Sequence, residues 1–138
     1  MHKAILFTVV SALLFSTPAF ALPPMPTYVK EALAEKPEYA KFAEVFAGLK
    51  MKCDMCHTPK ADKKAKGHGL NDFGHAMHDN LKHKEFMALH MTARANPADG
   101  KKALQLVVDA LEKASAEKNS DGKVYGDLIK AGQLPGKN

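Results

Sequence analysis

The stretch "KCDMCHTPK", residues 52–60, contains both cysteines of a 138-residue chain. Cys53 and Cys56 are separated by two residues, and His57 follows directly. Within a helical turn, this spacing places two thiols along one edge and makes the next side chain project from the same turn. The window therefore concentrates three side chains that can bind a metal or a cofactor within a single turn of backbone.

Cys-x-x-Cys-His is the attachment pattern for c-type haem. Each thiol adds to one vinyl group on the same edge of the porphyrin, and the histidine then lies under the ring, where it can bind iron. We therefore predict one covalently attached haem c. Cys53 and Cys56 are its predicted thioether donors, and His57 is the predicted proximal iron ligand.

Three other interpretations of the same window remain open. A structural zinc site needs four ligands, and a further histidine is available to join Cys53, Cys56 and His57. A thioredoxin-like redox pair requires a βαβ context, and no run of residues in this chain alternates as a strand does. The two thiols can also form a plain disulfide. An N-terminal export signal, the lack of other cysteines and a helical chain favour haem.

Residues 1–21 have the pattern of a secretory signal peptide. Lys3 gives a charged start, residues 4–15 an apolar segment and residues 19–21 a small-residue cleavage site. We expect cleavage after Ala21 and a periplasmic or otherwise exported protein, in an oxidising compartment. The apolar segment is shorter than the ~20 residues of a membrane-spanning helix, so no span is expected after cleavage. A retained N-terminal anchor is the alternative.

The chain is basic, with a formal net charge of +5, and Arg94 is its single arginine. Base-specific recognition of nucleic acid favours arginine, so we expect no nucleic-acid partner. Lysines cluster close to the cysteine window, at 60, 63, 64 and 66. They are expected to attract acidic redox proteins, although a solvated surface that only keeps the protein soluble has the same composition.

Hydrophobic periodicity predicts an all-α fold in which residues 38–138 form one domain. Residues 22–37 are expected to be a proline-rich arm, over 22–27, followed by a short helix. Two later segments carry apolar residues at i, i+3, i+4 and i+7, and a short helix is expected near the C-terminus. The predicted core positions are Phe42, Val45, Phe46, Leu49, Leu104, Val107, Val108, Leu111, Tyr125, Leu128 and Ile129.

Between these segments, residues 58–69 are expected to form a loop, and residues 70–96 a turn with one or two helices ending before Pro97. Asp99 is the predicted N-cap of the following helix. "NSDG", residues 119–122, is predicted to be a turn.

The order of helix, CxxCH, loop, "GLNDFG" (69–74) and C-terminal amphipathic helix resembles the class I family of small single-haem cytochromes c. That family carries a "GPNLxG" segment after CxxCH, and a carbonyl of that segment accepts the ring N–H of the proximal histidine. The resemblance therefore implies that Gly69 or Leu70 orients His57. Leu70 stands where the family has proline.

The tail "DGKVYGDLIKAGQLPG" (121–136), with "NDFG" (71–74), is similar to small monohaem cytochromes of planctomycete-type bacteria. One subset of those proteins uses a distal cysteine, and this chain has no cysteine left for that role. The two resemblances imply a cytochrome c-like helical domain around one haem. They also imply a one-electron carrier between periplasmic partners rather than an enzyme.

The sixth iron ligand sets the function, because methionine raises the reduction potential, histidine lowers it and an open site admits gases or peroxide. Met91 is the first candidate, since it is the methionine farthest along the chain and Pro97 follows it. If residues 81–93 are helical, it shares a face with other histidines and methionines. The alternative ligands are His90, Met77, His75 and His78.

Two other functions follow from other states of the sixth position. A weak or absent ligand would make the protein a haem-based gas-binding or sensor protein. His90 and Arg94, four residues apart on one helical face, would supply the distal groups of a minor peroxidase, or form an ordinary surface pair.

Overall fold

The computed structural model describes residues 25–61 and 69–136. The predicted signal peptide, its cleavage site and three of the four clustered lysines lie outside the described residues. In the described part the chain forms six α-helices and two short 3₁₀ turns. They are α1 (Met25–Ala34), η1 (Pro37–Tyr39), α2 (Ala40–Gly48), η2 (Lys52–Met55), α3 (Asp72–Asn80), α4 (His83–Ala93), α5 (Pro97–Ala116) and α6 (Tyr125–Lys130).

The predicted all-α class is confirmed. Across residues 25–61 and 69–136 the β-type pairing is limited to two isolated bridges, His57 with Leu70 and Lys118 with Val124. None of the helices formed by these residues is long and apolar enough to cross a membrane.

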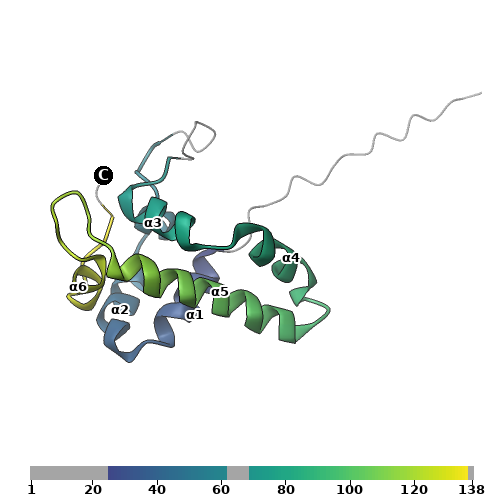
Figure 1. Cartoon of the computed structure of the whole chain (residues 1–138). Helices are drawn as coiled ribbons and strands as arrows, with labels where there is room; N and C mark the ends of the chain where they lie inside the picture. Colours follow the sequence, from purple (N-terminus) through teal and green to yellow (C-terminus); the bar gives the residue numbers. More distant parts are fainter. Residues whose placement is uncertain (1–24, 62–68, 137–138) are drawn as a thin grey trace, which may run out of the picture.

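Helix α5 is the central helix of the fold, and α1, α3, α4 and α6 pack against it. Figure 1 shows α5 running across the molecule, with α3 and α4 along one side, α1 and α2 along the other, and α6 at its C-terminal end. Its inner face buries Val107, Val108 and Leu111, as the periodicity predicts, and also three alanines that let the neighbouring helices approach closely.

The start of α5 differs from the prediction. Asn96 is the N-cap, and its side chain accepts a hydrogen bond from the backbone N–H of Ala98. Pro97 occupies the first helical turn, where its missing N–H costs nothing. Asp99, the predicted cap, lies inside that turn and accepts a 2.8 Å hydrogen bond from the Thr92 hydroxyl at the end of α4. It therefore ties α4 to α5.

Aromatic side chains fill the core from every side of α5. Phe42, Phe46, Phe73 and Phe86 are at most 2% exposed. Phe42 and Phe46 confirm the predicted stripe of α2, whereas Val45 is 37% exposed because it lies at the edge of that stripe.

The N-terminal helix begins earlier than expected. Residues 25–27, predicted as part of an extended arm, are the first residues of α1, where Pro26 is tolerated because first-turn N–H groups have no intrahelical acceptor. Tyr28 and Leu33 are buried, and α1 packs on α5. Tyr28 also makes an edge-to-face contact with Phe86 of α4, so α1 belongs to the same core as the rest of the chain.

The C-terminal segment closes the other end of the core. The predicted turn at 119–122 is present, and the Asn119 side chain accepts hydrogen bonds from the N–H groups of Asp121 and Lys123. In α6, Tyr125 packs edge to face on Phe73, with ring centroids 5.1 Å apart. Burial and the neighbouring Asp72 carboxylate, to which its hydroxyl donates, raise the pKa of Tyr125 to about 12.

This pKa predicts a loss of stability at high pH. Unfolding restores the ordinary tyrosine pKa, so the folded state holds its proton more tightly and its stability is intact below about pH 10. The free energy of unfolding should fall by roughly 1–3 kcal/mol as pH rises from about 10 to about 12. Tyr125→Phe should remove this part of the decline in urea titrations.

The matched control is Tyr39→Phe, which also removes one hydroxyl from a buried ring but leaves Asp72 and its partner intact. A decline that is equally steep in Tyr125→Phe and in the unaltered protein would contradict the assignment.

Candidate functional site

The cysteine window folds as one turn of helix. The N–H groups of Cys56 and His57 both bond to the carbonyl of Cys53, at 3.1 and 2.8 Å. Met55 points inward and is 1% exposed, whereas Cys53, Cys56 and His57 are only partly buried. The backbone therefore winds as the attachment motif requires, with Cys53, Cys56 and His57 projecting from one turn.

The segment "GLND" (69–72) lies directly beside this turn. The carbonyl of Gly69 accepts from the N–H of Thr58, and the N–H of Asn71 donates to the carbonyl of Cys56, both at 2.9 Å. These two bonds bracket the bridge between His57 and Leu70. The structure thus places the backbone predicted to orient His57 next to it, and Gly69 uses its carbonyl for the Thr58 N–H. A bond from the histidine ring to this segment stays a prediction.

Asn71 is the residue that fastens the two segments together. Its side chain is buried, accepts from the N–H of Gly74 at 2.8 Å and donates to the carbonyl of Met55 at 3.2 Å. It therefore caps α3 and holds the cysteine turn at the same time. Sequence reasoning missed this role, although an asparagine before a helical segment is an N-cap signal.

Gly74 allows the closest approach in the site. A Cβ added to it would lie 2.0 Å from the carbonyl oxygen of Cys56, so only glycine fits there. Gly136 is similar, since a Cβ at that position would lie 2.2 Å from the Asn71 amide nitrogen. The C-terminal tail, with Pro135 buried, thus covers Asn71.

The two thiols are free, and burial, with a smaller effect of Cys53, raises the pKa of Cys56 to about 12. Catalytic redox cysteines have lowered pKa values, so this environment differs from that of a thioredoxin-like pair. No three or more His, Cys, Asp or Glu side chains gather as a metal site in residues 25–61 and 69–136. A zinc tetrad is therefore not assembled in that part of the chain.

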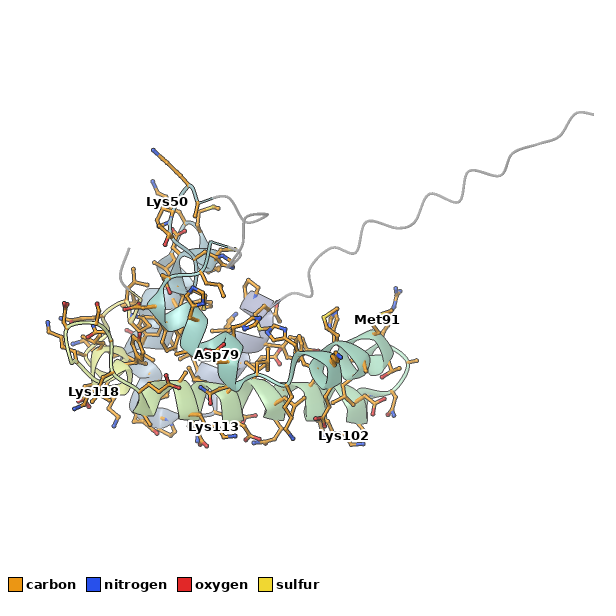
Figure 2. The ribbon with its side chains drawn as sticks, turned by 45° about the horizontal axis from the view of Figure 1, so that its top comes forward. Lys50, Asp79, Met91, Lys102, Lys113 and Lys118 are labelled. Atoms are coloured by element: carbon orange, nitrogen blue, oxygen red, sulfur yellow. The ribbon has the colours of Figure 1, made fainter. Side chains whose placement is uncertain are left out.

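The candidates for the sixth ligand are spread over α3 and α4. Met91, the first candidate, is 60% exposed. Figure 2 shows it at the opposite end of the molecule from Lys50, which precedes the cysteine turn. Met77 lies in the core, 7% exposed. Met91 projects outward because the inner positions of α4 are taken by Phe86, with Met87 and His90 partly buried.

The histidine candidates have different surroundings. His90 is partly buried between α1 and α4, where its Nδ1 lies 3.1 Å from the Tyr28 hydroxyl and its ring stacks on Phe86. His75 and His78 are exposed on α3. Arg94, the predicted peroxidase partner of His90, is an exposed residue at the C-cap of α4.

The residues present fit a c-type haem on the attachment side. The two thiols and the imidazole that would hold it are on the same turn, and their residues are only partly buried beside Met55. On the other side of the iron, the structure leaves the choice among the candidates open.

The chain was compared with known protein families, curated proteins and solved structures. No protein-family model matches the chain, and searches of curated proteins and of solved structures give no match either.

The close approach at Gly74 predicts a large effect of a single methyl group. Gly74→Ala should lower the free energy of unfolding by about 1–3 kcal/mol or more, because the new Cβ overlaps a backbone oxygen that cannot move without opening the turn. Chemical denaturation followed by circular dichroism measures it.

Gly48→Ala is the control, since a Cβ there meets nothing within 4 Å. It should be neutral or slightly stabilising because alanine favours helix. Equal effects of the two substitutions would show that the contact between α3 and the turn does not matter.

Proposed function

We propose that this chain is an exported c-type cytochrome with one haem that carries single electrons between redox partners. The observation that carries the proposal is the single turn from which Cys53, Cys56 and His57 project, with the "GLND" backbone paired alongside. Two thiols and an imidazole in this order match the attachment chemistry of one haem.

Each residue of the site has a part in this function. Cys53 and Cys56 would hold the cofactor covalently, and His57 would bind its iron on the proximal side. Asn71 and Gly74 keep the turn pressed against α3, which fixes the direction in which His57 points. When bound, the haem supplies a one-electron Fe(III)/Fe(II) couple. The all-α core gives it a rigid surrounding, which keeps structural change between the two states small.

The surface next to the turn suits an acidic partner. Lys50 and Lys60 are exposed on either side of the cysteines, and Met51, between Lys50 and the turn, is 55% exposed. Positive charge accelerates the encounter with an acidic protein, and an accessible apolar side chain offers contact area once it docks.

Docking at this surface predicts a salt-sensitive rate. Electron transfer to a small acidic redox protein should slow as salt is added, because ions screen the attraction. Lys50→Glu and Lys60→Glu should each slow it at low salt. Lys113→Glu on α5, which Figure 2 shows well away from Lys50, makes the same charge change and should have a smaller effect. Stopped-flow kinetics measures these rates, and a salt-independent rate argues against the docking surface.

A second function, ligand binding at a labile sixth position, has one observation in its favour. The leading ligand candidate, Met91, is exposed and remote from the cysteine turn, and His90 is engaged with Tyr28. A haem without a strong sixth ligand binds small gases and serves as a sensor. A minor peroxidase function has less support, because Arg94 is exposed at a helix end.

Carbon monoxide separates the two functions. For an electron carrier we expect a six-coordinate ferrous haem whose absorption spectrum is unchanged by carbon monoxide. Met77→Ala, in contrast to Met91→Ala, should make the haem reactive if the buried methionine is the ligand. Rapid binding of carbon monoxide to the unaltered protein would instead favour the ligand-binding function.

A further inference from the structure

Two histidines meet at the corner between α3 and α4. His78 lies in the last turn of α3 and His83 is the first residue of α4. Their rings are 4.4 Å apart between centroids and tilted by 41°. Both side chains are exposed, so neither ring is placed there to fill the core.

Asp79 gives one of these rings a defined orientation. Its carboxylate oxygen lies 3.4 Å from Nδ1 of His78. A carboxylate only accepts hydrogen bonds, so this contact favours the tautomer in which Nδ1 carries the proton and the lone pair of the neutral ring is on Nε2. Histidines that bind metals usually donate their other nitrogen to a carboxylate in this way. Figure 2 shows Asp79 on the surface where α3 leads toward α4.

The separation of the rings matches a shared metal ion. A metal about 2.0–2.1 Å from one nitrogen of each ring holds two ring centres about 4.5 Å apart when its two bonds are perpendicular and about 5.2 Å apart when they are tetrahedral, so the 4.4 Å separation is close to the perpendicular case. From this geometry we propose that His78 and His83 bind a divalent transition-metal ion of the zinc, copper and nickel class, for which imidazole is a preferred ligand.

The site is a two-histidine site completed by water. The exposed corner lets solvent reach the metal, and no third His, Cys, Asp or Glu joins the pair within the described residues. Lys82, which lies between the two helices, would oppose a cation there, but its ammonium group is 3.6 Å from the carboxylate of Glu85. A bound metal would link the end of α3 to the start of α4 and so restrain the corner at Leu81 and Lys82.

Zinc chloride is the probe that tests this site, because zinc undergoes no redox reaction with haem. Isothermal titration of the haem-loaded protein should show one zinc ion bound per chain. His78→Ala and His83→Ala should each abolish the binding heat. His75→Ala removes another exposed imidazole from the same helix and should leave the heat unchanged.

Three results would overturn the assignment. They are the absence of zinc binding by the unaltered protein, an equal loss in His75→Ala, or binding that persists when His78 and His83 are both replaced. Persistent binding in that double variant would point to zinc on unblocked cysteines, so a failure of haem attachment is distinguishable from a failure of this site. Circular dichroism of the variants should match the unaltered protein, because both side chains are exposed.

Discussion

The close contact between the Cys56 carbonyl and the first turn of α3 is the constraint on which the site depends. Gly74 permits it by having no Cβ, and Asn71 reinforces it with hydrogen bonds to both partners. The tail then covers Asn71 at Gly136. Segments from the middle and the end of the chain therefore converge on one short turn. Such convergence is expected where a cofactor must be held in one orientation, since positioning groups act through the ligands they support.

The same turn is linked to the global core through its own buried side chain. Met55 belongs to the same buried cluster as the phenylalanines of α2 and α3 and the valines and leucine of α5, and Tyr125 of α6 joins that cluster through Phe73. The half of the molecule that lies away from the cysteine turn is held together by other contacts. There α4 pairs with the first half of α5, and α1 is joined to α4 through Tyr28, Phe86 and His90. His90 therefore takes part in the packing between α1 and α4.

The sequence was informative where local chemistry decides structure. Apolar spacing placed α2, α5 and α6, and the CxxCH window and Asn-Ser-Asp-Gly turn were identified from residue type alone. Tertiary contacts decided the features that the sequence pattern did not predict correctly. Asn96 rather than Asp99 caps α5, because the helix begins at Pro97, and Asp99 accepts a hydrogen bond from Thr92 instead. The exposure of Met91 depends on which face of α4 meets α5, and helical spacing alone does not say which face that is.

The most direct test of the central claim is the intact mass of the denatured protein, produced from the full chain in a host with haem c maturation. A haem held by two thioethers survives unfolding, so the mass should exceed that of the mature chain by one haem. Cys53→Ser with Cys56→Ser should abolish this increment. A denatured protein with the mass of the bare chain, alone or with a zinc ion, would contradict the assignment.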